Sequence, residues 1–70
     1  MSLATLFEPR TPVYSGTGEE LQKVQRLLTD NHIPFKLKPD GAKTRVFVKR
    51  SLADKGEMLI REAKARNWLW

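Results

Sequence analysis

The stretch IPFKLKPDGAKTRVFVKR, residues 33–50, is typical of a β-hairpin. Each half alternates in a period of two, so each strand has one apolar side and one side rich in cations. The turn chemistry of Pro-Asp-Gly-Ala at residues 39–42 separates the two halves. The apolar side holds Ile33, Phe35, Leu37, Val46 and Val48. The opposite side holds Lys36, Lys38, Arg45, Phe47 and Lys49.

A short strand and a helix are predicted before the hairpin. Two prolines in residues 8–12 favour extended backbone, and residues 13–15 read as a short edge strand. Thr17 begins the helix in a capping-box pattern, in which its hydroxyl accepts from a backbone amide and Glu20 reaches back. The helix ends before Pro34, which biases the preceding residue out of the helical region. Its apolar stripe consists of Leu21, Val24, Leu27 and Leu28.

A second helix is predicted after the hairpin. The segment Ser-Leu-Ala-Asp at residues 51–54 is expected to cap it. Gly56 lies inside this helix at a cost of about 1 kcal/mol relative to alanine. We interpret Gly56 as a site of close helix packing rather than as a ligand contact. The buried stripe of this helix is Leu52, Leu59, Ile60 and Ala63. The residues expected to be mostly buried are Leu21, Val24, Leu28, Phe35, Leu37, Val46, Val48, Leu59 and Ile60.

These elements predict an α+β fold with the order β-α-β-β-α. The apolar faces are all satisfied if both helices cover one side of a three-stranded antiparallel sheet. We expect the strands, counted along the chain, to lie in the order 2-3-1, a ferredoxin-like arrangement that lacks the fourth strand. The predicted organisation is an extended N-terminal segment at residues 1–12, a single α+β domain at 13–66 and an apolar C-terminal tail at 67–70.

The net charge of +5 lies in one part of the chain. Residues 36–50 contain six basic residues and one acid, whereas the rest of the chain is neutral, with seven of each. A localised positive field attracts particular partners, so this hairpin is where a partner is expected to dock.

The composition limits the function classes. The absence of cysteine and a single histidine, His32, leave neither a disulfide nor a thiolate metal site nor a histidine cluster. Residues 16–18, Gly-Thr-Gly, lack the third glycine and the lysine of a phosphate-binding loop. We therefore expect no enzyme activity, no metal and no cofactor. Without a signal-peptide pattern or an apolar run of about 20 residues, the chain is expected to be cytoplasmic.

Part of the chain resembles a known family. The matching segments are Val13-Tyr14-Ser15, Glu20-Leu21 through Leu27-Leu28, Asn31-His32-Ile33-Pro34-Phe35, Val46-Phe47-Val48 through Asp54, and Met58-Leu59-Ile60. They resemble the short domains described as prokaryotic signal-transducing proteins, a family of unknown function similar to half of the PII-type signal-protein fold. The resemblance covers roughly residues 13–64. His32 stands where that family usually has glycine, so a left-handed backbone is expected there. The resemblance implies no enzyme activity, no cofactor and no agreed binding residues.

Two readings of the outward sheet side remain open. Alternation places Tyr14 and Phe47 there, framed by Lys36, Lys38, Arg45 and Lys49. Two aromatic side chains among cations suit a single-stranded nucleic acid, whose bases stack on rings while its phosphates meet cations. The glycine-rich aromatic signature of RNA-recognition domains is missing. The other reading is an ordinary exposed face, or one that a protein partner covers.

Both termini carry apolar residues that need a place. They are Leu3, Leu6 and Phe7 at the start and Trp68, Leu69 and Trp70 at the end. The C-terminal tail is expected to fold over the outward sheet side, to dock across a dimer interface or to make shallow membrane contact. A weak homodimer through residues 3–14 or 68–70 is expected, because it would add buried apolar surface to a small core and cover the open edge of the sheet.

The sequence therefore predicts a non-enzymatic regulatory or signalling-type binding module. Its partner is a protein or a small ligand, it self-associates, and a membrane is not the expected partner. The alternative is single-stranded nucleic-acid binding through the basic hairpin 36–50 and the outward sheet side.

Overall fold

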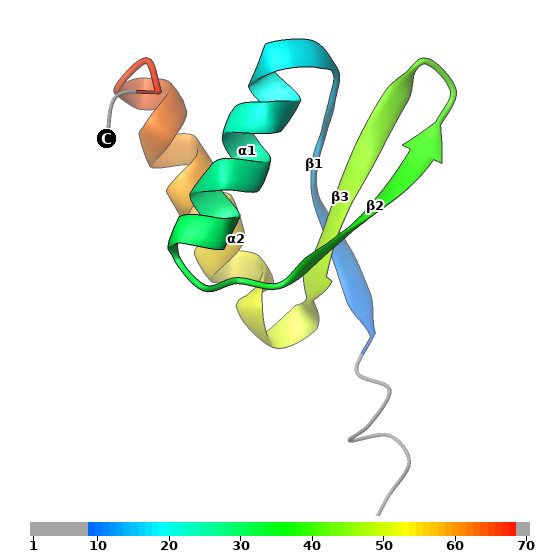
Figure 1. Cartoon of the computed structure of the whole chain (residues 1–70). Helices are drawn as coiled ribbons and strands as arrows, with labels where there is room; N and C mark the ends of the chain where they lie inside the picture. The colour runs from blue at the N-terminus through cyan, green and yellow to red at the C-terminus, as the bar shows by residue number, and fades with distance from the viewer. Residues whose placement is uncertain (1–8, 69–70) are drawn as a thin grey trace, which may run out of the picture.

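Five elements follow one another in the predicted order β-α-β-β-α (Figure 1). The computed structural model describes residues 9–68. Its elements are β1 (Arg10–Gly16), α1 (Gly18–Asp30), β2 (Phe35–Asp40), β3 (Lys43–Lys49) and α2 (Arg50–Ala65). The three strands are antiparallel and lie in the order β1-β3-β2, which confirms the predicted α+β class and strand order. The arrangement is consistent with a ferredoxin-like fold without its fourth strand.

The hairpin forms as the sequence predicts. β2 and β3 pair from Phe35–Val48 to Asp40–Lys43, which leaves a two-residue turn. Gly41 begins this turn with φ 64°, a backbone region that glycine enters without steric cost. A positive φ at the first turn residue alone is the pattern of a type II′ turn, whose twist suits a two-residue hairpin.

The core lies between the sheet and the two helices, which are on the same side of it (Figure 1). Of the residues expected in the core, Leu21, Phe35 and Leu59 are only half-buried, and Leu37 is 45 % exposed. The prediction for Leu37 is wrong because the helices pack mainly against β1 and β3, which leaves the middle of β2 uncovered. The buried residues are Val24, Leu27, Leu28, Ile33, Val46, Val48, Ala53, Ile60 and Ala63.

Helix α1 ends in a Schellman motif with histidine in the left-handed position. His32 has φ 59°, which confirms the left-handed backbone expected at this position. The amide of Ile33 donates to the Leu28 carbonyl at 2.9 Å, and the amide of His32 donates to the Thr29 carbonyl at 3.0 Å. Both bonds satisfy carbonyl groups that the end of a helix leaves without partners.

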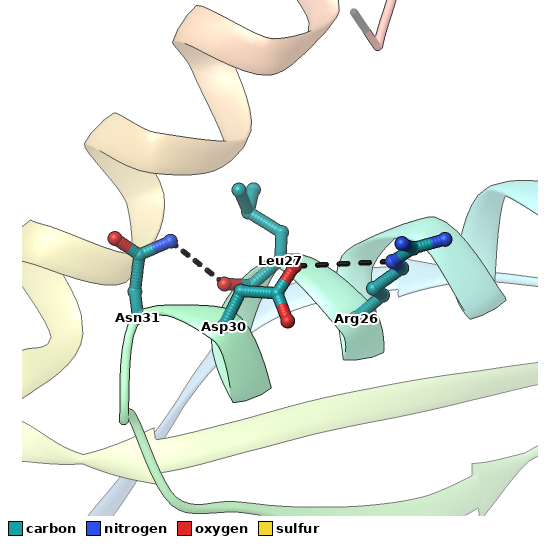
Figure 2. Close-up of polar contacts among 4 residues, drawn as sticks. All are labelled: Arg26, Leu27, Asp30 and Asn31. Carbon is teal, nitrogen blue, oxygen red and sulfur yellow. Dashed lines mark hydrogen bonds and ion pairs between the residues drawn. The ribbon is translucent and has the colours of Figure 1, made fainter. Parts of the chain in front are cut away.

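Two polar contacts decorate the same helix end (Figure 2). Asn31 Nδ2 donates to the Leu27 carbonyl oxygen at 2.8 Å, and the same oxygen also accepts the Asn31 backbone amide at 3.2 Å. Arg26 Nε lies 3.8 Å from Asp30 Oδ2 on the solvent side, where a pair contributes little to stability. The turn is therefore closed mainly by backbone and amide hydrogen bonds.

Helix α2 differs from its prediction at the start. It begins at Arg50 with Lys49 as N-cap, so residues 51–54 lie inside the helix instead of capping it. The reason is that β3 runs directly into α2, and the Arg50 amide donates to the Pro9 carbonyl at 3.0 Å. The far end has a second Schellman pattern, with left-handed backbone at Asn67 and Trp68.

Trp68 packs against the core on the helix side of the sheet. It therefore does not fold over the outward side, which corrects one of the three predicted destinations of the tail for this residue. The other tail residues, Leu69 and Trp70, and the N-terminal Leu3, Leu6 and Phe7 lie outside the described residues.

Candidate functional site

The basic residues of the hairpin lie together on the sheet side opposite the helices, which we call the outer face. Val46 and Val48 are buried against the helices, so the residues between and beside them point outward. Strand register then places their neighbours on the same side. The outer face consists of Arg10, Pro12 and Ser15 of β1, Lys36, Lys38 and Asp40 of β2, and Lys43, Arg45, Phe47 and Lys49 of β3. Within residues 9–68 both helices lie on the other side (Figure 1), so no described element covers this face.

Phe47 occupies the central strand of the outer face. It is half-buried and stands between Pro12 on β1 and Lys36 on β2, which are its partners in the strand register. The row on one side of this one holds Arg45 and Lys38, and the row on the other side holds Lys49 and Arg10. Neighbouring strands are about 4.8 Å apart, and alternate residues of one strand are about 7 Å apart. The backbone positions next to Phe47 are therefore occupied mainly by cations.

Charge on the outer face is strongly one-sided. Six cations share it with one carboxylate, which gives +5, the net charge of the entire chain. Arg45 Nε lies 2.9 Å from Asp40 Oδ2. Among residues 9–68 no other cation of this face has an ion-pair partner. The field of these cations is therefore directed at whatever approaches the face.

Two shallow hollows follow one another along the β2 side of the face. The larger, of about 360 Å³, is lined by Arg10, Lys36, Leu37, Lys38 and Phe47. The smaller, of about 80 Å³, is lined by Arg10, Pro34, Phe35, Lys36 and Lys49. Arg10 and Lys36 line both, so the two hollows lie next to each other with cations along them, and we call the pair the track. An open track suits an extended ligand better than a small molecule, which usually occupies an enclosed cavity.

Tyr14 does not lie on the outer face, which corrects its predicted position. Its register partner is the buried Val46, because a β-bulge between Pro12 and Tyr14 adds one residue to β1. Both Val13 and Tyr14 consequently pack against the core on the helix side. The outer face has one aromatic side chain, Phe47, where the sequence predicted two.

On the helix side Tyr14 joins β1 to both helices. Its hydroxyl donates to Glu20 Oε1 at 2.8 Å, and Lys64 Nζ lies 3.7 Å from the same oxygen. Burial, the hydrogen bond to Glu20 and the charge of Glu20 raise the pKa of Tyr14 to about 12. Glu20 therefore does not complete the predicted capping box. Thr17 is the N-cap residue of α1 but makes no side-chain capping bond.

Two outer-face cations were not among the residues predicted for this side: Lys43, which lies within the basic hairpin, and Arg10, which lies outside it. The prolines of residues 8–12 argued for a strand that begins at Val13, whereas β1 begins at Arg10 and pairs it with Lys49. The two-residue spacing of Arg10 and Pro12 could have placed Arg10 on this side. The bulge after Pro12 interrupts that spacing before Tyr14. The predicted cations Lys36, Lys38, Arg45 and Lys49 lie together on the outer face as expected.

Both sheet edges carry features that oppose the addition of a strand. At β1 these are Pro12, which has no amide proton, and the bulge that follows it. At β2 they are Pro39 and the edge lysines Lys36 and Lys38. A partner is therefore expected to lie on the outer face rather than to extend the sheet.

Other chemistry-bearing groups do not gather into a site. His32 is exposed at the end of α1, where its backbone conformation accounts for its position. Residues 9–68 contain no group of three histidine, cysteine or acidic residues placed to hold a metal ion. In the same range no helix is both long and apolar enough to cross a bilayer.

Comparison with known proteins does not add a function to this geometry. The chain matches no protein family, no curated protein and no solved structure. The function is therefore inferred from the outer face itself.

Proposed function

We propose that this protein is a non-enzymatic binding module that recognises an anionic partner through the outer face of its sheet. The observation that carries the proposal is the grouping of six cations and one carboxylate around the partly exposed Phe47 on a face that no described element covers. A regulatory or signalling role, which the family resemblance implies, is compatible with such a module.

The remaining surface supports the choice of this face. The exposed positions of α1 and α2 carry acids and bases together. Mixed charges of this kind are typical of a solvated helix surface. Burial and the neighbouring Glu20 raise the pKa of Tyr14 to about 12, so its hydroxyl is unsuited to proton transfer near neutral pH. Binding is therefore better supported than catalysis.

Binding to an immobilised polyanion tests the proposal. We expect the doubly substituted variant Lys36→Gln/Lys38→Gln to elute from a heparin column at clearly lower salt than the unchanged protein, because two cations of the track are lost. The matched control is Lys23→Gln/Lys55→Gln, which removes two exposed cations from the helices and has the same net charge. This control is expected to elute close to the unchanged protein. Equal shifts in the two variants would show that retention follows net charge alone and would contradict the proposal.

Self-association is a separate proposal. The predicted weak homodimer involves residues 3–14 or 68–70, most of which lie outside the described residues. The features of the β1 edge argue for contact through side chains rather than through strand pairing. Sedimentation equilibrium tests this, and a constant mass of 8.1 kDa up to millimolar protein would contradict the homodimer.

A further inference from the structure

We propose that the anionic partner is a single-stranded nucleic acid, with one base stacked on Phe47 and the neighbouring phosphates held by the cations around it. The inference rests on the proposed function and names its ligand class. A stacked base requires a flat apolar surface, and its phosphates require cations next to that surface on the same face. Phe47 supplies the first, and Lys36, Arg45 and Lys49 supply the second.

The composition of the outer face favours a nucleic acid over a protein partner. Lysine is depleted at the centre of protein–protein interfaces, which bury aromatic and aliphatic side chains there. The outer face offers one aromatic ring, two prolines near it and six cations, four of which are lysines. Interfaces with nucleic acids are more polar and much more positively charged than interfaces between proteins. A chain of phosphates thus complements this face better than a folded protein surface does.

The shape of the face favours a single strand over a duplex. The cations lie along the track, which Phe47 also lines. An aromatic ring can stack only on a base whose flat face is accessible. In a duplex the base faces are covered by their neighbours, so the Phe47 ring would have no base on which to stack. A sheet that presents an aromatic ring between cations is the arrangement that sequence-tolerant single-strand binders use.

The track gives the ligand a direction. The two hollows extend from Pro34 and Lys49 at one end, past Arg10 and Lys36, to Lys38 at the other. Lys36 and Lys38 point to the same side of β2 about 7 Å apart, which allows them to meet different phosphates of one strand. The strand is therefore expected to run along β2 with a base turned inward onto Phe47.

Fluorescence anisotropy with two oligomers tests this inference separately from the proposed function. The first probe is a ten-nucleotide oligothymidylate, and the second is an abasic deoxyribose-phosphate oligomer with the same number of phosphates. We expect the thymidylate to bind about 5- to 150-fold more tightly, the range for one stacked base. In Phe47→Leu this difference should fall to within about twofold while affinity for the abasic oligomer is unchanged, since removal of the ring abolishes stacking and leaves the cations in place. Phe47→Tyr keeps a ring and should keep the difference.

The outcomes distinguish the two proposals. Equal affinity of the unchanged protein for both oligomers, or a preference that survives in Phe47→Leu, would overturn the stacking inference and leave anion binding intact. Absence of binding to both oligomers at low salt would overturn the nucleic-acid inference, whereas the proposed function is decided by the heparin experiment. A blunt-ended DNA duplex without a loop serves as a control, because its affinity should be the same in Phe47→Leu and in the unchanged protein.

Discussion

Replacement of the buried Gly56 by alanine is expected to stabilise the protein. The glycine is part of α2 and does not have a positive φ, so its backbone is open to any residue. A Cβ atom there would lie 3.7 Å from Leu28 Cδ2, 3.8 Å from Val13 Cγ1 and 3.9 Å from Val48 Cγ2. These are ordinary van der Waals distances, so the core has room for the methyl group. Close helix packing, our sequence-based interpretation of Gly56, does not require a glycine at this position.

The size of the effect follows from two contributions. Replacing a glycine in a helix interior by alanine contributes about 1 kcal/mol, because the unfolded chain loses conformational freedom. Burial of one methyl group against three apolar side chains adds up to about 0.8 kcal/mol. The free energy of unfolding should therefore rise by about 1–2 kcal/mol. For a domain of this size each kcal/mol raises the melting temperature by about 4–8 °C.

Thermal and urea denaturation followed by far-ultraviolet circular dichroism measure the change. Gly16→Ala is the control of opposite sign, since a Cβ atom on Gly16 would lie 2.8 Å from Tyr14 Cε2 and closer still to the Tyr14 hydroxyl. That variant should melt at a lower temperature because the Tyr14 ring has to move. A lower melting temperature for Gly56→Ala would refute the reasoning, since it would mean that the two helices and the sheet leave no space at this position.

Three further predictions follow from the same structure. In urea denaturation, Leu28→Ala should lower the free energy of unfolding by about 2–5 kcal/mol because Leu28 is fully buried. Leu37→Ala should lower it by less than about 1 kcal/mol because Leu37 is 45 % exposed, and similar losses in the two variants would contradict the observed core. His32→Gly should raise the free energy of unfolding by about 1 kcal/mol, because glycine adopts the left-handed backbone of this position without steric cost. The control Thr29→Gly, inside α1, should lower it, and a lower free energy of unfolding in both variants would contradict the Schellman turn. The chain's one tyrosine, Tyr14, should have a pKa of about 12 in the folded protein and about 10 in urea, as followed by tyrosinate absorbance. Its contribution to the free energy of unfolding is therefore fully present below pH 10 and is lost as the pH rises from 10 toward 12. A midpoint at pH 10 in the folded protein would contradict the burial of Tyr14 beside α1.

Several features could be predicted from the sequence because they depend on neighbours along the chain. The hairpin turn follows from the glycine at position 41, and the end of α1 follows from Pro34 and from a residue that tolerates positive φ. The basic side of the hairpin follows from two-residue alternation in β2 and β3. The alternating cations Lys36 and Lys38 therefore reached the candidate site by local pattern alone.

Other features were decided only when distant segments met. The bulge in β1 depends on its hydrogen bonding with β3, and one added residue moved Tyr14 from the outer face to the helix side. The same pairing extended β1 to Arg10 and brought this cation beside Lys49. Leu37 has the alternation of a core residue but stays partly exposed, because the helices pack mainly over β1 and β3 and do not cover this part of β2. Periodicity says which residues share a side of a strand; register and helix placement, which are set by contacts far apart in sequence, say what that side meets.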